Sequence, residues 1–388
     1  MERLFAVCAP GLERFTAQEL EQLGLIPSHS SSRSEDSPFG SGSKSEPGGI
    51  EFQGSLQGVY RANLHLRTAS RVLVRLGEFS ASAFPELRRK ASRLAWEDYL
   101  PAERSIALRV TCHKSRLYHA GAVAERLAGA IADRLEKPPS VRKYNEDSPT
   151  DVPQLILVRI VDNLCTISID SSGALLHKRG YRLATAKAPL RETVASAMVI
   201  ASGWDGASPF LDPFCGSGTI PIEAALLAKR IPPGYSRRFA FMDWPNFDSK
   251  IWDKLVTGAA KAIVFARPKI IASDRDAGAI QAARDNAQRA GVGDCIEFSC
   301  KSISAIDPPP SPGWMVTNPP YGVRLSKTKD LRNLYAQLGN VLRTRCPGWH
   351  VTLVCDSIQL IGSTGLKFGN GISMTTGGLR VKLVTGQV

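Results

Sequence analysis

The sequence predicts an α/β fold in which a parallel sheet carries a nucleotide-type site at its carboxyl edge. Two short stretches point to this fold: Pro-Phe-Leu-Asp-Pro-Phe-Cys-Gly-Ser-Gly-Thr at 209–219 and Trp-Met-Val-Thr-Asn-Pro-Pro-Tyr-Gly at 314–322. Each starts as an apolar run typical of a buried strand and is stopped by proline, which cannot donate to a strand ladder. A third observation is the mixed strand and helix pattern of residues 1–170, which predicts a separate α/β region.

The first stretch predicts a strand, a glycine loop and a helix. Gly216 and Gly218 permit left-handed or closely approached backbone. Thr219 is the expected helix cap, and Pro221 suits the first helical turn. Such loops bind nucleotides at the carboxyl ends of parallel strands.

S-adenosylmethionine is the ligand that best fits this loop. A phosphate loop needs a lysine after Gly218, and a dinucleotide fingerprint needs a third glycine where Pro221 stands. S-adenosylmethionine has no phosphate, and it needs an acid for its amino group and backbone near its ribose. Asp274, after the predicted strand 269–273, can accept the ribose hydroxyls. An ordinary glycine turn is the alternative. The residues assigned to the donor here are Asp212, Pro213, Phe214, Gly216, Gly218, Thr219, Asp274 and Asn318.

The second stretch predicts a rigid clamp for an amino group. Pro319 and Pro320 fix their φ angles. The side-chain oxygen of Asn318 and the carbonyl of Pro319 can accept the two hydrogens of an amine and stabilise charge developing on its nitrogen. Tyr321 offers a flat face for a base. The alternative is a proline-rich turn with an exposed tyrosine.

Together the two motifs resemble those of the THUMP-containing class I RNA methyltransferases, above all the bacterial large-subunit rRNA guanine-N2 enzymes and their tRNA relatives. Segments 176–182, 188–193 and 334–339 share the resemblance, which spans nearly the whole chain except residues 28–47. It implies a Rossmann-like class I domain with a seven-stranded mixed sheet at 176–388. It also implies a THUMP domain at 50–170, preceded by an α/β segment at 1–66.

The resemblance also implies individual site residues. Pro189 and Leu190 are expected to line the donor pocket. The family usually has an aspartate after the third strand, for the adenine amino group, but this chain has Lys301-Ser302. Ser302 or a backbone group is then expected to take that role.

Charge and composition agree with a nucleic-acid partner. The net charge of +13 over 388 residues suggests a polyanion, here rRNA or tRNA. Eight scattered cysteines form no zinc pattern, so we expect reduced thiols and no metal. No apolar run reaches membrane-spanning length, and the first strand begins almost at once, so we expect a cytoplasmic monomer, with a chloroplast or other organelle as the alternative location.

Two basic segments are candidate RNA contacts. Lys114, Arg116 and His119 lie in a loop between a predicted strand and a helix, where helix-start potential favours phosphate. Lys178 and Arg179 lie in a connector. In both cases the alternative is a solvated charged loop.

The remaining elements follow from periodicity and turn residues. Residues 28–47 are predicted to be a disordered insertion, and the aromatic-rich segment 232–252 a packed layer or a base-stacking surface. The expected strands are 4–8, 49–52, 71–76, 106–110, 269–273, 296–300 and 350–355, with hairpins at 154–169 (turn 162–163) and 366–384 (turn 369–371). The expected helices are 11–23, 56–70, 84–99, 122–135, 190–200, 277–290 and 331–342.

Three other functions stay open from the residues alone. N6-adenine methylation of DNA uses a similar proline clamp, and protein glutamine methylation also modifies an amine, although the positive charge disfavours it. A non-catalytic RNA-binding factor that has lost the donor is the third, supported by Lys301-Ser302.

Overall fold

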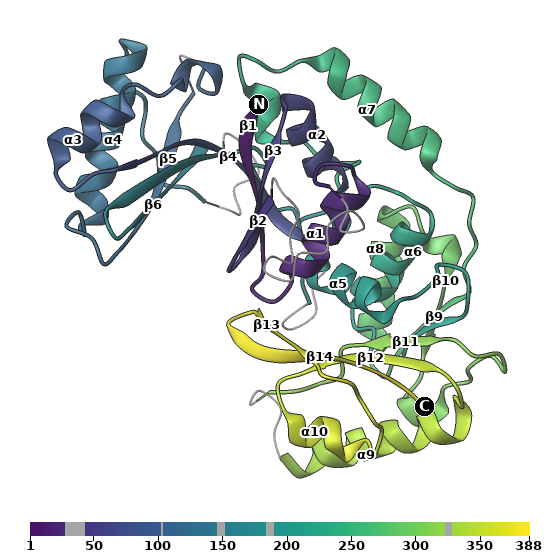
Figure 1. Ribbon diagram of the computed structural model, residues 1–388. Helices are drawn as coiled ribbons and strands as arrows, with labels where there is room; N and C mark the ends of the chain where they lie inside the picture. The colour runs from purple at the N-terminus through teal and green to yellow at the C-terminus, as the bar shows by residue number, and fades with distance from the viewer. Residues whose placement is uncertain (28–42, 102–103, 146–151, 184–189, 323–327) are drawn as a thin grey trace.

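Two seven-stranded sheets, one in each half of the chain, organise the computed structural model (Figure 1). The structure describes residues 1–27, 43–101, 104–145, 152–183, 190–322 and 328–388. Within these ranges we find no helix with the length and apolar character that a bilayer crossing requires.

The first sheet has the strand order β2-β3-β1-β4-β7-β6-β5. Its neighbours run antiparallel except β5 and β6, which are parallel. The strands are β1 (Glu2–Cys8), β2 (Ser43–Glu46), β3 (Gly49–Gly54), β4 (Ala69–Ser80), β5 (Ile106–His113), β6 (Gln154–Val161) and β7 (Leu164–Asp170). The helices of this half are α1 (Glu13–Gln22), α2 (Leu56–His65), α3 (Phe84–Ala91) and α4 (Ala120–Leu135).

The edge strand β2 corrects the predicted disordered insertion. Residues 43–46 pair antiparallel with β3, so the prediction is wrong at its carboxyl end. Their sequence, Ser-Lys-Ser-Glu, has no apolar side chain, and the pairing depends on backbone hydrogen bonds that no sequence pattern reveals. Residues 28–42 lie outside the described residues.

The single helix predicted for residues 84–99 is also wrong. Helix α3 ends at Ala91, and a 3₁₀ turn covers Trp96–Asp98. The chain turns there because Trp96 is fully buried and its indole donates a hydrogen bond to the carbonyl of Ala91 at 2.8 Å. The hairpin at 162–163 is confirmed, with positive φ at Asp162 and Asn163.

The second sheet has the order β10-β9-β8-β11-β12-β14-β13. The first five strands in this order are parallel, whereas β14 runs antiparallel to both β12 and β13. This mixed seven-stranded sheet confirms the predicted fold class. The strands are β8 (Phe210–Asp212), β9 (Ile270–Asp274), β10 (Ile296–Cys300), β11 (Trp314–Thr317), β12 (His350–Cys355), β13 (Ile372–Thr376) and β14 (Leu379–Gln387).

Helices cover both faces of the second sheet. Helices α5, α6 and α8 pack in one buried cluster, and α9 and α10 pack in another on the opposite face (Figure 1). The closing hairpin β13–β14 is confirmed, but its turn is at Gly377-Gly378, not at 369–371. The helices are α5 (Glu192–Ser202), α6 (Thr219–Ala228), α7 (Ser249–Ala262), α8 (Ala277–Arg289), α9 (Thr328–Arg345) and α10 (Ile358–Ser363).

The aromatic-rich segment 232–252 joins the two halves. Phe239, Phe241 and Trp244 are buried in the core of the first half, where Phe241 stacks on Tyr60 with ring centroids 4.5 Å apart. The segment is therefore a packed layer, as one of the two interpretations had it. It follows α6 in the chain, so it fastens the RNA-facing half to the helix that begins at the glycine loop.

Candidate methyl-donor and amine site

The glycine loop follows β8 and bends back toward α6. Gly216 and Gly218 both have positive φ, at +52° and +86°. A Cβ at Gly218 would lie 3.0 Å from the Cβ of Ala283 on α8, so the backbone approaches this helix closely. Thr219 was expected to cap α6, but Gly218 occupies the cap position and Thr219 is the first helical residue.

Asp274 lies at the end of β9, against the same loop. Its Oδ2 accepts a hydrogen bond from the backbone N–H of Gly216 at 3.0 Å, and its Oδ1 accepts one from the N–H of Asp276 at 3.0 Å. A carboxylate oxygen can accept more than one hydrogen bond. The predicted ribose acceptor is therefore held in a fixed orientation beside the glycine loop.

Asp212 is buried between the two motifs. It is 1% exposed, and its Oδ1 accepts hydrogen bonds from the Thr317 hydroxyl at 2.6 Å and from the Phe214 N–H at 3.2 Å. Its Oδ2 is buried without a partner in the described structure. Burial raises the pKa of Asp212 to about 7, against the opposing effect of these hydrogen bonds. A cationic ligand would relieve this burial cost.

The clamp follows β11 directly. Since β11 pairs parallel with β8, Asn318 leaves its strand at the edge where the glycine loop leaves β8. The Oδ1 of Asn318 is buried and has no hydrogen-bond partner among the described residues. Pro319 is buried and Pro320 is half-buried. A buried acceptor without a donor is costly, so this oxygen fits a ligand N–H.

Tyr321 completes the clamp as a neutral aromatic face. It is half-buried and packs against the clusters on both faces of the second sheet. Burial, together with nearby Cys355 and Asp356, raises the pKa of Tyr321 to about 12. The phenol therefore stays protonated at neutral pH and is available for stacking, not for proton abstraction.

The remaining predicted donor contacts differ in how far the structure describes them. Ser302 follows β10, is exposed and forms a hydrogen bond with the Ser304 hydroxyl at 2.9 Å. Its predicted contact with the adenine amino group stays a prediction. Pro189 lies outside the described residues.

A brace under the glycine loop was missed by sequence reasoning. The side-chain amide of Asn286, fully buried on α8, donates to the carbonyl of Ser217 at 3.0 Å. Arg289 donates to the Oδ1 of Asn286 and, through Nε, to the carbonyl of Tyr181 at 2.8 Å. An asparagine on a helix rich in polar residues carries no sequence signal for this role.

The predicted RNA contacts at the β5–α4 loop are exposed. Lys114 has a positive φ of 45°, and the N–H of Arg116 donates to the Oδ1 of Asn163 at 2.8 Å. His119 caps α4, because its Nδ1 accepts the N–H of Ala122 at 3.1 Å. Both long basic side chains lie free on the surface for a phosphate, whereas His119 has a structural role as well.

Arg179 requires a correction, because the structure buries it. It is 5% exposed, lies 3.6 Å from the carboxylate of Glu223, and donates to the carbonyl of Arg67 at 2.6 Å. Glu223 also accepts hydrogen bonds from Tyr181 and Ser196. Arg179 therefore ties the two halves together and does not present its guanidinium to RNA. Its neighbour Lys178 is half-buried.

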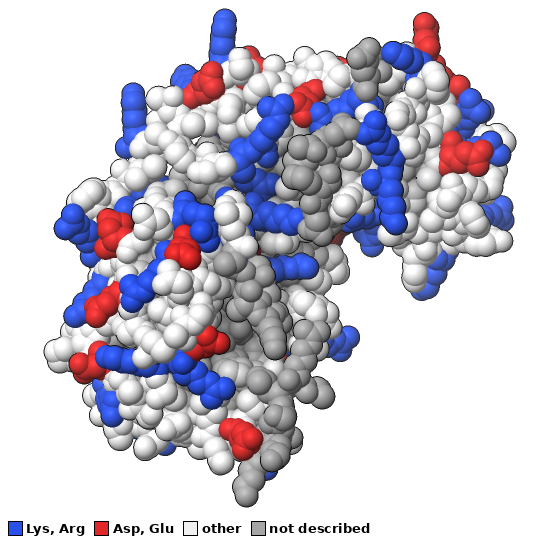
Figure 2. All heavy atoms as spheres, turned by 180° about the vertical axis from the view of Figure 1, so that it is seen from behind, with Lys and Arg blue, Asp and Glu red and all other residues white. Residues whose placement is uncertain are grey.

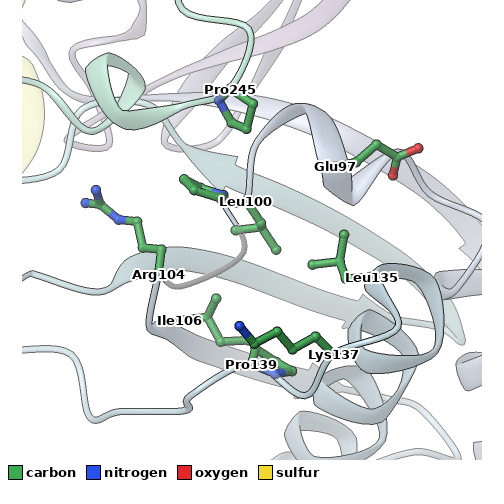
Figure 3. Close-up of a pocket in the computed structure, with 9 residues that line it drawn as sticks. Glu97, Leu100, Arg104, Ile106, Leu135, Lys137, Pro139 and Pro245 are labelled. Atoms are coloured by element: carbon green, nitrogen blue, oxygen red, sulfur yellow. The ribbon is translucent and has the colours of Figure 1, made fainter.

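The surface and the cavities fit an RNA partner without adding a second site. Figure 2 shows lysine and arginine side chains spread over one face of both halves, with acidic ones scattered among them. A cavity of about 310 Å³ lies between β5, α4 and Pro245 (Figure 3). Of its charged residues, Glu97 pairs with Arg134 and Arg104 with Asp243. It lies in the first half, and none of the predicted site residues lines it.

Comparisons with known proteins decide the family. Three family models match: "RMKL-like, methyltransferase domain" at residues 179–365, "RlmL ferredoxin-like domain" at 39–73 and "THUMP domain" at 81–170. The "Putative RNA methyltransferase slr0064" of Synechocystis sp. is 34% identical over 98% of this chain and 95% of its own length. The chain belongs to the THUMP-containing class I RNA methyltransferases.

Further relatives support this RNA methyltransferase assignment. The "Ribosomal RNA large subunit methyltransferase K/L" of Syntrophotalea carbinolica is 33% identical over 98% of this chain. The present chain spans about half of that relative, 53% of its length. A crystal structure described as "a putative methyltransferase complexed with SAH" superposes with a TM-score of 0.85 at 28% identity, covering 99% of this chain and 97% of that one. The predicted donor, S-adenosylmethionine, is thereby confirmed.

The site residues suit this donor. The buried Oδ2 of Asp212 lacks a partner, and the orphaned Oδ1 of Asn318 lies at the same sheet edge. A sulfonium with an amino group supplies positive charge for the first, and an incoming amine supplies hydrogens for the second. The described residues contain no cluster of histidine, cysteine or acidic groups that would hold a metal ion.

Proposed function

We propose that this RNA methyltransferase methylates the exocyclic N2 amine of a guanine in ribosomal RNA. The orphaned Oδ1 of Asn318, buried beside the donor loop, is the observation that carries the proposal. The ribosomal target is supported by the printed names of the K/L relatives, of which this chain spans about half. A transfer RNA target is the nearest alternative.

The clamp compensates for a weak nucleophile. The lone pair of an exocyclic amine is delocalised into its ring, so the nitrogen attacks poorly. The Oδ1 of Asn318 and the carbonyl of Pro319 accept its two hydrogens, which favours tetrahedral geometry and stabilises the positive charge that develops. Bound S-adenosylmethionine supplies the electrophilic methyl group. As the new N–C bond forms, the C–S bond breaks with its electrons going to sulfur, and the surplus amine proton leaves to water.

Rate enhancement then depends mainly on alignment. Rigid prolines after Asn318 hold both acceptors in one place, which is worth several orders of magnitude when reacting groups are correctly oriented. The guanine must leave its stack to reach this edge, and Tyr321 replaces a stacking neighbour. Cys215 has its pKa raised by burial and lies in the glycine loop, so it serves packing and not nucleophilic chemistry.

Two other readings share some of these features. N6-adenine methylation would use the same clamp, because adenine also presents an exocyclic amine. A non-catalytic RNA-binding factor is favoured by Lys301-Ser302 alone, whereas the unpartnered acceptors at Asn318 and Asp212 favour a working site.

Labelling of RNA tests the reaction. Total RNA from cells that lack the gene is incubated with the protein and methyl-labelled donor, digested to nucleosides and separated. We expect label in N2-methylguanosine with the wild type and almost none with Asn318→Ala. Label in N6-methyladenosine would establish the adenine reading instead, and lack of both methylation and donor binding would establish the RNA-binding factor.

We also propose that the enzyme works as a cytoplasmic monomer without a metal. Light scattering of the purified protein, metal analysis and the location of a fluorescent fusion test these three points separately. An organellar signal from the fusion would favour the chloroplast or another organelle.

A further inference from the structure

The end of strand β12 places a carboxylate beside the clamp. β12 pairs parallel with β11, so residues just beyond Cys355 leave the sheet at the same edge as Asn318. Asp356 is the first of them and is exposed. A Cβ added at Gly322, the last residue of the Asn-Pro-Pro-Tyr-Gly turn, would lie 3.7 Å from Oδ2 of Asp356. The proximity of this carboxylate also contributes to the raised pKa of Tyr321.

Nothing in the described structure neutralises this carboxylate. Among the residues described, no lysine or arginine forms an ion pair with Asp356. Its closest printed polar contact is the thiol of Cys355, 3.9 Å from Oδ1. The acid is also not needed to cap α10, because the hydroxyl of Ser357 accepts the N–H of Leu360 there. Both oxygens are therefore available to a ligand held by the clamp.

The chemistry of the two purines differs at the atom beside the target amine. In guanine the ring nitrogen N1, next to the carbon that bears the amine, carries a hydrogen. In adenine the corresponding N1 carries a lone pair. An ionised carboxylate only accepts hydrogen bonds, so it attracts the first atom and repels the second. Because a hydrogen bond to a charged group contributes about 1.5–3 kcal/mol, one such acid can set a strong preference.

We propose that Asp356 selects guanine over adenine by accepting the N1 hydrogen while the Asn318 clamp holds the amine. This inference rests on the proposed function and names the group that fixes its substrate base. Asn318 and the carbonyl of Pro319 recognise any exocyclic amine, whereas Asp356 reads the neighbouring ring atom. The clamp supplies rate and Asp356 supplies the choice of base.

The probe that isolates this contact is 2-aminopurine. It keeps the C2 amine of guanine, but its N1 carries a lone pair and no hydrogen. Once the methylated nucleotide has been mapped, synthetic RNA fragments are made with guanine, 2-aminopurine or adenine at that position. The ratio of kcat/KM for guanine to that for 2-aminopurine is measured for the wild type and for Asp356→Asn, in which an amide N–H can donate to the lone pair.

We expect Asp356→Asn to lower this ratio at least about tenfold, partly by loss on guanine and partly by gain on 2-aminopurine. Asp253→Asn, an exposed acid on α7, should leave the ratio unchanged. Asn318→Ala should lower both rates and leave the ratio near its wild-type value. Donor titration confirms that each variant is folded.

The outcomes separate this inference from the function beneath it. If the wild type methylates guanine and Asp356→Asn keeps the wild-type ratio, Asp356 does not read the base and the proposed function stands. If the wild type methylates adenine, or no guanine at all, the proposed function fails and the assignment of Asp356 fails with it.

Discussion

The hydroxyl of Thr317 donates a hydrogen bond to Oδ1 of Asp212 at 2.6 Å, and this bond joins the two motifs of the site. The two residues are 105 positions apart in the chain, yet each ends a strand and the strands are neighbours. The donor loop begins at Asp212 and the amine clamp begins one residue after Thr317. One contact therefore sets the spacing between methyl donor and acceptor.

Removing the clamp acceptor should separate turnover from donor binding. We expect Asn318→Ala to lower kcat by about 10²–10³, the usual cost of losing one positioned group that stabilises developing charge. The dissociation constant for S-adenosylmethionine should stay within about twofold, by titration calorimetry. Asn340→Ala, an exposed change on α9, is the matched control. Unchanged kcat in Asn318→Ala would contradict the assigned role.

Loss of the link between the motifs should weaken the donor site. Thr317→Val keeps the shape of the side chain and removes the donor to Asp212, which leaves a buried carboxylate with fewer hydrogen bonds. Its pKa should rise further, and donor affinity at pH 7 should fall by about tenfold, equivalent to one hydrogen bond of about 1.4 kcal/mol. Thr352→Val, also buried but on β12, is the control. Equal donor affinities in the two variants would argue against the link.

Donor affinity should depend on pH through Asp212. The pKa of this acid is raised to about 7 in the free protein, and a cationic donor favours the ionised form. Affinity should therefore rise as the pH increases toward about 7 and level off above it, with proton release on binding below that pH. Calorimetry in buffers of different ionisation enthalpy measures the proton count. Asp212→Asn should lose both the pH dependence and most of the affinity.

The brace under the glycine loop should matter for donor binding without touching the reaction. Asn286→Ala leaves the Ser217 carbonyl without its buried donor, so we expect the free energy of unfolding to fall by about 1–3 kcal/mol. Donor affinity should fall as well, because the loop is no longer held, while kcat at saturating donor is retained. The exposed neighbour Gln288→Ala should change neither quantity. A loss of kcat alone would mean that Asn286 acts differently.

Arg179 should affect stability more than RNA affinity. Arg179→Ala leaves Glu223 buried and unpaired, which typically costs about 3–5 kcal/mol. The melting temperature should drop clearly, whereas Lys114→Ala and Arg116→Ala should leave it unchanged and weaken RNA binding, with a smaller salt dependence. These quantities are measured by thermal unfolding and by filter binding at several salt concentrations. A stable Arg179→Ala protein with weakened RNA binding would restore the original prediction.

Much of the fold and site could be predicted from local patterns. The glycine loop, the proline clamp and the strand before each are contiguous in sequence, and their residue types constrain backbone and chemistry directly. The hairpin at Asp162-Asn163 follows from a turn pair that tolerates positive φ. In contrast, β2 has no apolar alternation, and the end of α3 depends on burying Trp96 in a distant core.

The amino-acid sequence by itself determined the order of strands and helices in the catalytic half, the donor loop and the amine clamp, because short-range backbone preferences and side-chain chemistry encode them. Only the tertiary structure decided that Asn286 braces the loop, that Asp356 lies beside the clamp and that Arg179 is buried instead of facing RNA. A charged or polar side chain has the same local signal on a surface as in a junction. Its role depends on which distant residues remove it from water, and that is a property of packing.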